Sequence, residues 1–169
     1  MKTETTLSRP VRIVVIGAGN RAHKYLEYAR RNPEQLRLAA IVEVNDLRRR
    51  AMADAFGLPD KYCYAHYDDF FAERLDADMV LISTPENVHF DPAVKAIDAG
   101  YHILLEKPIA QHLEECREIA RRARERGVMV GVCHVLRYHP YFAKIREIVA
   151  SGELGQVVSV NHTASVGLD

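Results

Sequence analysis

The chain has 169 residues, enough for one domain that buries roughly 70% of its unfolded surface but too few for two full-sized domains. Its 23 lysines and arginines balance 23 aspartates and glutamates, so charge gives no reason to expect a nucleic acid or an acidic membrane as a partner. Apolar residues make up 48% of the chain, as in globular proteins, but no apolar run approaches the roughly 18 residues that cross a bilayer.

Short apolar runs alternate along the chain with longer amphipathic runs. The apolar runs predict buried strands, because branched apolar residues follow one another almost without interruption. The predicted strands are Val11–Ile16, Leu38–Val42, Tyr62–Tyr64, Met79–Ile82, Tyr101–Leu105 and Val128–Val132. The amphipathic runs end at glycine or before proline and predict helices. The predicted helices are Asn20–Arg31, Asp46–Phe56, Asp68–Glu73, Asn87–Ala99 and His112–Arg126.

Strands that alternate with helices imply βαβ units joined by right-handed crossovers. The sequence therefore predicts an α/β fold with a doubly wound parallel sheet, whose strands are apolar throughout because helices cover both faces. The last part of the chain breaks the alternation, since Pro140–Ala150 predicts a helix and Gln156–Thr163 a strand with no obvious sheet of its own. We interpret this part as the beginning of a second domain whose remainder is missing.

The run VVIGAGNRAH carries a glycine pattern where the first strand turns into a helix. Gly17, Gly19 and Ala22 match the G-x-G-x-x-G/A fingerprint of dinucleotide-binding proteins. Gly17 makes the tight turn, Gly19 lets the backbone approach a pyrophosphate, and Ala22 lets the helix pack closely on the sheet. The N–H groups and the positive end of the helix dipole, around Asn20 and Arg21, favour the phosphates. By itself this pattern fits an ordinary tight turn equally well.

The fingerprint also expects an acid roughly 20 residues further on, at the end of the second strand, and Glu43 stands at that strand end. A carboxylate there accepts hydrogen bonds from the ribose hydroxyls of NAD and repels the 2′-phosphate of NADP. Arg48–Arg50 leave NADP possible, because one of them could reach a 2′-phosphate, although arginines on a helix are more often a solvated face. A methyltransferase-like site is the weaker alternative, because it usually has a third glycine where this chain has Arg21.

Ligands of open parallel sheets bind outside the carboxyl ends of the strands. The fourth predicted strand is followed by STPENVHF, Ser83–Phe90, and the fifth runs into LLEKPIA, Leu104–Ala110. Lys107 follows an apolar strand and is held in place by Pro108. A lysine at this position, near a cofactor and partly desolvated, could shuttle protons. The plainer interpretations are a surface lysine and, for His89, a histidine at a helix start.

Taken together, the motifs make the sequence resemble the N-terminal part of the Gfo/Idh/MocA family, the glucose–fructose oxidoreductase and inositol dehydrogenase group. The resemblance covers nearly the whole chain. The matching stretches are GAGNRA at Gly17–Ala22, the acid Glu43, STPENVHFDPAVKAIDAGYHILLEKPIA at Ser83–Ala110, and LRYHPYFAKIREIVASGELGQV at Leu136–Val157.

The resemblance implies a Rossmann domain, residues 1–135, followed by the beginning of an α+β substrate and oligomerisation domain, residues 136–169. It implies that Lys107 is catalytic, positioning the substrate and relaying a proton, and that Pro108 sits in a turn that often has a cis bond. Arg137 matches an arginine close to the cofactor. Further implied cofactor contacts, mostly on the nicotinamide side, are Ser83, Thr84, Pro85, Asn87, His89 and Glu106, together with Lys107 itself.

The activity implied by this resemblance is that of an NAD(P)-dependent oxidoreductase acting on CH–OH groups of a sugar, cyclitol or related polyol. NAD is the expected cofactor, with NADP possible, and a homo-oligomer is expected in the full-length parent. The family's usual catalytic Asp and His lie beyond the end of this chain, so we expect a truncated product or an excised domain. The alternative is a catalytically inactive NAD(P)-binding module or an assembly fragment.

The remaining residues of chemical interest are the cysteines. Cys63, Cys116 and Cys133 are odd in number and far apart, which fits reduced thiols and a cytoplasmic location. The polar segment Met1–Pro10 lacks the apolar core of a signal peptide. A metal site built from Cys133, His134 and His139 fits no zinc spacing, so no metal is expected.

Overall fold

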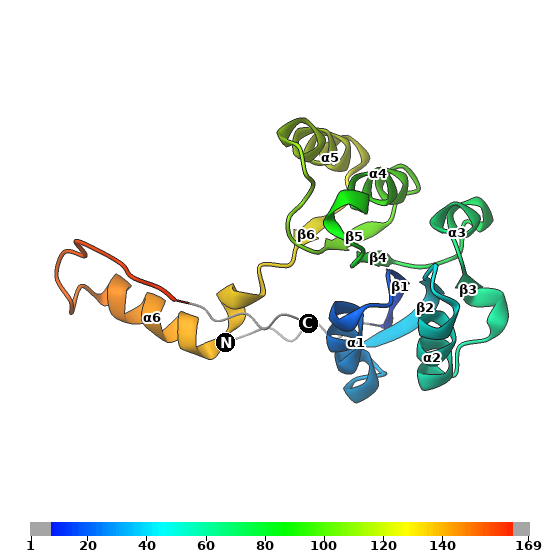
Figure 1. Cartoon of the computed structure of the whole chain (residues 1–169), viewed down its shortest axis with the longest axis horizontal. Helices are drawn as coiled ribbons and strands as arrows, with labels where there is room; N and C mark the ends of the chain where they lie inside the picture. Colours follow the sequence, from blue (N-terminus) through cyan, green and yellow to red (C-terminus); the bar gives the residue numbers. More distant parts are fainter. Residues whose placement is uncertain (1–7, 164–169) are drawn as a thin grey trace. The chain divides into compact units, whose positions relative to one another are not determined.

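A computed structural model describes residues 8–163 and divides the chain into two compact units with the boundary between Cys133 and His134. The first unit contains a parallel six-stranded sheet with helices on both sides (Figure 1). The strands lie in the order β3-β2-β1-β4-β5-β6. Their bounds are β1 Val11–Ile16, β2 Leu36–Val42, β3 Cys63–Tyr64, β4 Met79–Ile82, β5 His102–Leu105 and β6 Val130–Val132.

The helices of the first unit connect these strands. They are α1 Asn20–Arg31, α2 Asp46–Phe56, α3 Tyr67–Glu73, α4 Phe90–Asp98 and α5 Leu113–Arg126, with short 3₁₀ turns η1 Asp60–Tyr62 and η2 Glu86–Val88. The α/β fold with a parallel sheet is therefore confirmed. Most boundaries differ from prediction by one or two residues, as where β2 begins at Leu36. The largest difference is at the helix expected from Asn87, where the turn η2 comes first and α4 begins only at Phe90.

Both faces of the sheet are covered, which explains the unbroken apolar runs. Successive strand residues point to opposite faces: Ile13 and Val15 pack on the side of α1 and α2, while Val14 and Ile16 pack on the side of α4 and α5. All four are at most 3% exposed. The part of a strand that is covered on both faces tolerates few polar residues, so the apolar pattern and the two-sided cover have the same cause. Arg12 and Arg37 stand at the less buried starts of β1 and β2.

Capping residues position several of the helices. Asn45 accepts a hydrogen bond from the backbone N–H of Arg48 at 3.0 Å and so caps the start of α2. Gly57 ends α2 with a left-handed φ of +59°. Helix α1 differs, because its N-cap residue, Gly19, has no side chain to cap the first turn.

The strand order reverses between β1 and β4. From β1 the chain winds outward to β2 and β3, then returns to pair β4 with the other side of β1 and continues to β5 and β6. Such a switch point opens a crevice at the carboxyl ends of the two central strands, because their connections leave in opposite directions. The segments after Ile16 and Ile82 therefore flank the place where ligands of this fold class bind.

The second unit holds the turn η3, Val135–Tyr138, and helix α6, Pro140–Ser151. The strand predicted over Gln156–Thr163 is wrong: these residues are exposed and form no strand. A strand needs a neighbour to complete its hydrogen bonds, and no described residue pairs with this stretch. None of the helices within residues 8–163 has the length and apolar composition of a membrane-spanning segment.

Candidate nucleotide-binding site

Gly17 makes the sharp turn that follows β1. Its φ is +93°, and a Cβ placed on it would lie 2.9 Å from the backbone of Ser83 and Thr84. The turn is held by backbone and side chain alike: Gly17 N–H donates to the carbonyl of Val42 at 2.8 Å, and Ser83 Oγ donates to the carbonyl of Gly17 at 2.8 Å. Glycine is needed here for both conformation and space.

The start of α1 is built to leave backbone N–H groups available. Gly19 has an extended backbone, and no atom of the described chain lies within 4 Å of where its Cβ would project. The first intrahelical bond runs from His23 N–H to the Gly19 carbonyl, so the N–H groups of Asn20 and Arg21 have no helical partner. Ala22 is fully buried and lets the helix lie close to the sheet. This arrangement suits an anion, because the free N–H groups and the positive end of the helix dipole both face the space in front of the helix.

Glu43, immediately after β2, is tied to the glycine turn. Its Oε2 accepts the N–H of Ala18 at 2.7 Å and its Oε1 accepts the N–H of Asn45 at 2.9 Å. The residue is only 8% exposed. Because each carboxylate oxygen has two lone-pair sites, Glu43 keeps capacity to accept hydrogen bonds from a ligand's hydroxyl groups while its orientation is fixed by the main chain.

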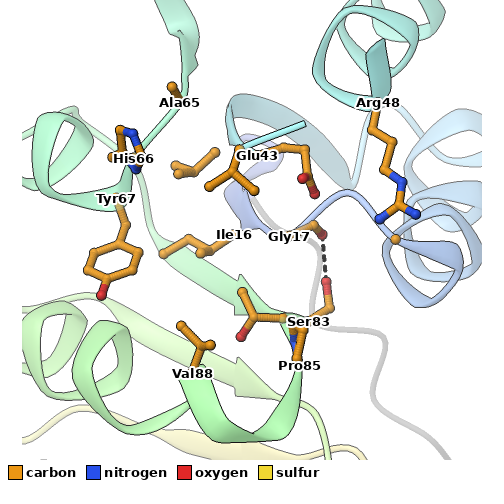
Figure 2. A pocket seen from close by; sticks show the side chains of 14 residues that line it. Ile16, Gly17, Glu43, Arg48, Ala65, His66, Tyr67, Ser83, Pro85 and Val88 are labelled. Atoms are coloured by element: carbon orange, nitrogen blue, oxygen red, sulfur yellow. Dashed lines mark hydrogen bonds between the residues drawn. The ribbon is translucent and has the colours of Figure 1, made fainter. Parts of the chain in front are cut away.

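These features line a cavity of about 480 Å³ at the carboxyl ends of four strands (Figure 2). The size is within the range of small-molecule sites. Four groups of residues contribute, one at or after the carboxyl end of each of β1, β2, β3 and β4. They are Ile16, Gly17 and Gly19; Val42, Glu43, Val44 and Arg48; Ala65, His66 and Tyr67; and Ser83, Thr84, Pro85 and Val88.

The cavity wall contains one buried polar atom without a partner. Thr84 Oγ1 is buried and makes no hydrogen bond with any described residue. An unpaired buried hydroxyl costs free energy unless something completes it. Thr84 lines the cavity beside Pro85, so a polar ligand group there would complete it. The unpaired hydroxyl, the open approach to Gly19 and the uncapped start of α1 all fit a dinucleotide.

His89 lies beneath this wall rather than in the cavity lining. It is 1% exposed, and its ring joins two main-chain carbonyls: Nδ1 is 2.7 Å from the oxygen of Pro108 and Nε2 is 3.0 Å from that of Thr84. Carbonyl oxygens only accept, so each contact is a hydrogen bond only when that ring nitrogen carries a hydrogen. His89 thus acts on the site through the two loops, and its placement does not favour the direct cofactor contact expected from the sequence.

Glu106 is held between α1 and the turn that carries Lys107. Its Oε1 accepts from the Tyr25 hydroxyl at 2.6 Å, and its Oε2 accepts from Lys107 N–H at 3.1 Å. Burial is the main cause that raises the pKa of Tyr25, with Cys133 and Glu106 adding to it. Burial also raises the pKa of the Cys133 thiol. Both groups therefore stay protonated at neutral pH, and the Tyr25 hydroxyl remains a donor.

Lys107 itself is exposed in the turn after β5, so the protein alone does not provide the partial desolvation expected beside a cofactor. The bond between Lys107 and Pro108 is cis, as the family resemblance suggested. Asn87 is exposed in η2, and Arg137 is exposed in η3 of the second unit. Of the predicted cofactor residues, those that share the cavity lining are Gly17, Gly19, Glu43, Ser83, Thr84 and Pro85.

Sequence reasoning missed part of the cavity. Val44, Val88 and the segment 65–67 also line it, and of the three arginines 48–50 considered from the sequence only Arg48 does. The signal for the segment was present, because 65–67 follow the third strand and the strand-end rule applies to every strand of the sheet. Among the described residues, no group of three or more His, Cys, Asp or Glu side chains is placed to hold a metal ion.

Comparison with known families agrees with this geometry. Residues 11–134 match the family model described as the oxidoreductase family with an NAD-binding Rossmann fold. The chain belongs to the Gfo/Idh/MocA oxidoreductase family. Its match ends just past β6, so the family's NAD-binding Rossmann domain corresponds to the sheet that carries the cavity.

Individual Gfo/Idh/MocA relatives are similar over most of this chain. An uncharacterized oxidoreductase of Rhizobium meliloti is 33% identical, covering 89% of this chain and 44% of the relative. A D-xylose 1-dehydrogenase (NADP(+)) of Haloferax volcanii is 35% identical, covering 77% of this chain and 39% of the relative. The crystal structure of an inositol dehydrogenase homolog of Azotobacter vinelandii with NADH and myo-inositol has a TM-score of 0.75 and 26% identity, covering 89% of this chain and 42% of that one. The chain thus spans less than half the length of these relatives.

Proposed function

We propose that the first unit binds NAD(H) and serves an NAD(P)-dependent dehydrogenase that interconverts alcohol and carbonyl groups of a sugar, cyclitol or related polyol. The observation that carries the proposal is the pairing of Gly17 and Glu43 at one cavity. A glycine turn with an uncapped helix start and an acid after the neighbouring strand are the two halves of the dinucleotide fingerprint. The relatives' names, which include a D-xylose dehydrogenase and an inositol dehydrogenase homolog, support the substrate class.

Each part of the cavity has a distinct task in this proposal. The amides around Asn20 and Arg21 hold the diphosphate, and Glu43 accepts hydrogen bonds from the ribose hydroxyls. Thr84 and Pro85 form the wall on the nicotinamide side. Bound there, the nicotinamide supplies the hydride acceptor. Lys107 gives or takes the proton at the reacting oxygen, on a turn fixed by Glu106.

The second unit is the beginning of the substrate and oligomerisation domain in this proposal, with residues 1–135 forming the dinucleotide-binding domain. Its exposed apolar side chains support that role, because Tyr138, Val158 and Val160 are at least 84% exposed and such surfaces are normally covered. We propose a homo-oligomeric, cytoplasmic enzyme. The three cysteines, which are unpaired thiols in the structure, support a reducing compartment.

A titration with NADH tests the cofactor half of the proposal. The 169-residue chain is titrated by calorimetry and by nicotinamide fluorescence, and saturable binding below millimolar concentration is expected. Gly19→Val is expected to abolish binding without unfolding the chain, because a larger side chain enters the phosphate approach and its Cβ has open space around it. Arg117→Ala, on the exposed face of α5, is the control and should bind as the wild type does. Absence of saturable binding at millimolar NADH would contradict the proposal.

The catalytic half needs the longer protein. Lys107→Ala in a full-length parent should lower kcat far more than it lowers cofactor affinity, measured with a panel of polyols and sugars. An unchanged kcat removes Lys107 from the mechanism. A full-length parent that binds NADH but turns over no member of the panel points to a binding module instead.

A further inference from the structure

A second cavity lies at the amino ends of β1 and β2, at the opposite end of the sheet from the nucleotide cavity. Its volume is about 440 Å³, and a smaller cavity of about 260 Å³ shares Arg37, Leu38 and Phe56 with it. We call the two together the amino-end cavity, and their size is that of a small-molecule site. None of the residues that line it lines the nucleotide cavity, so a ligand here would share no residue with NAD(H).

The lining of the amino-end cavity carries positive charge and no acid. Arg9, Arg12 and Arg37 line it, whereas no aspartate or glutamate does. Two of these arginines are held by acids that lie outside the lining: Arg9 pairs with Asp78 and Arg12 with Asp76. Because an arginine side chain has five N–H donors, an ion pair with one acid fixes the guanidinium and still leaves donors for a ligand.

Arg37 is oriented without an acid. Its Nε donates to the carbonyl of Pro33 at 3.0 Å, and it forms no ion pair within residues 8–163. It is exposed and lines both parts of the cavity. A guanidinium fixed through Nε presents its two Nη groups side by side, which matches the two oxygens of a carboxylate.

The wall beside these arginines is apolar. Phe56, Leu58 and Tyr62 line the larger part of the cavity and are only partly buried by the protein. Apolar surface of this kind gains free energy when another apolar group covers it. A hydrated inorganic anion cannot do so, and the wall therefore favours an acid that has an organic body.

The carboxyl end of α2, at Gly57, opposes an anion, because the last helix carbonyls together carry about half a negative charge. Two of them, of Ala53 and Asp54, already accept the N–H groups of Leu58 and Gly57. The full positive charge of Arg37, which no acid among residues 8–163 offsets by an ion pair, exceeds what remains of this partial charge.

We propose that the amino-end cavity binds a small organic acid, whose carboxylate pairs with Arg37 and whose apolar or aromatic body packs on Phe56 and Leu58. The cavity volume suits a free molecule of this kind. The site is separate from the nucleotide cavity and does not depend on the proposed dehydrogenase activity.

The test uses 3-phenylpropionate as the probe and the 169-residue chain with ¹³C-labelled leucine methyl groups. Saturable NMR shifts of Leu38 and Leu58 are expected, with a dissociation constant of about 1 mM or lower. The neutral analogue 3-phenyl-1-propanol should bind the wild type at least about tenfold more weakly, because it lacks the charge-assisted pair. Inorganic phosphate should bind more weakly than the organic acid, because it leaves the apolar wall uncovered.

Matched variants assign the charge. Arg37→Gln should weaken 3-phenylpropionate binding at least about tenfold and leave binding of the alcohol and of NADH unchanged. Arg31→Gln is the control, since it removes an exposed charge that is paired with Glu27 and lines neither part of the cavity; it should bind the acid as the wild type does.

Equal affinity of the wild type and Arg37→Gln for 3-phenylpropionate would overturn the proposal. No saturable shift of Leu38 or Leu58 at about 20 mM acid would also overturn it. If the alcohol or inorganic phosphate binds the wild type as tightly as the acid does, the cavity does not recognise an organic acid. These comparisons of probes need no variant, so they test the proposal even if Arg37→Gln lowers the melting temperature.

Discussion

The hydroxyl of Tyr25 donates a 2.6 Å hydrogen bond to Oε1 of Glu106, joining helix α1 to the end of β5 across 81 positions of sequence. The other oxygen of Glu106 accepts from the Lys107 N–H. Because α1 also presents the amides proposed to hold the diphosphate, one side chain connects the phosphate end of the site with the turn that carries the proposed catalytic lysine. The distance between these two parts is therefore set by packing within the Rossmann domain.

Tyr25→Phe should preserve the fold and loosen this connection. Removing a hydrogen bond to a buried carboxylate is expected to lower the free energy of unfolding by about 1.5–3 kcal/mol, measured by urea denaturation at pH 7. The matched control is Tyr28→Phe, also on α1, whose hydroxyl donates to the exposed Gln35 and whose loss should cost under about 1 kcal/mol. Equal effects of the two substitutions would show that Glu106 is held without Tyr25.

Replacing each of the two fingerprint glycines with alanine should affect different properties: stability at Gly17 and cofactor binding at Gly19. Gly17→Ala meets the backbone of Ser83 and Thr84 at 2.9 Å and is strained at φ +93°, so the free energy of unfolding should fall by about 2 kcal/mol or more. Gly19→Ala meets no protein atom within 4 Å and should change stability by under about 0.5 kcal/mol.

The same pair is then tested for cofactor binding. Gly19→Ala should weaken NADH binding at least about tenfold, equivalent to about 1.4 kcal/mol, because its methyl group enters the phosphate approach. Thermal denaturation and calorimetry on the same samples separate the two effects. A Gly19→Ala chain that binds NADH as well as the wild type would place the diphosphate elsewhere.

Thr84→Val tests whether the unpaired hydroxyl in the cavity wall meets the cofactor. Since Thr84 Oγ1 has no partner among the described residues, replacing it with a methyl group should leave stability unchanged or raise it by up to about 1 kcal/mol. NADH affinity should fall about fivefold, the effect of one ordinary hydrogen bond. Thr84→Ser keeps the hydroxyl and should bind as the wild type does. Unchanged NADH affinity in Thr84→Val together with lower stability would mean that the hydroxyl stabilises the folded chain and does not contact the cofactor.

The sheet could be predicted well from the sequence, because each buried strand is itself a run of apolar, mostly branched residues. Residues 13–16 of β1 are buried on both faces, so the apolar residues that this burial needs also identify the strand in the sequence. The turn at Gly17 and the acid Glu43 were predictable for a similar reason, since backbone conformation and charge demand particular residue types at those positions.

Side-chain partners could not be predicted in this way. Nothing in the run Arg48–Arg50 shows that Asp46 binds two of the arginines and leaves the first facing the cavity, because helix rotation decides this. His89 presents the same problem, since its two carbonyl partners come from separate loops. The strand predicted over Gln156–Thr163 failed because a strand depends on a partner, and apolar β-branched residues report only the potential to pair.

Asp78, directly before β4, gives a prediction on acid stability. It binds Arg9 through two hydrogen bonds of 2.7 Å and accepts the Arg12 N–H at 2.7 Å, so the Arg9 contact chiefly lowers the pKa of Asp78 from 3.8 to about 2. A carboxyl whose folded pKa lies below its unfolded pKa stabilises the fold above the unfolded value, and this stabilisation is lost as pH falls through the folded value.

Asp78→Asn should therefore lower the free energy of unfolding at pH 7 by about 1 kcal/mol, a figure reduced for solvent screening at a partly exposed pair. The difference between wild type and variant should shrink to roughly half at pH 3, where the unfolded carboxyl is mostly protonated while the folded one is still ionised. Urea denaturation at the two pH values measures it. Asp76→Asn, which removes a much more exposed partner of Arg12, should show a smaller difference at pH 7. If the difference in free energy of unfolding between wild type and Asp78→Asn is the same at pH 7 and pH 3, Asp78 acts through hydrogen bonding or packing that does not depend on its charge.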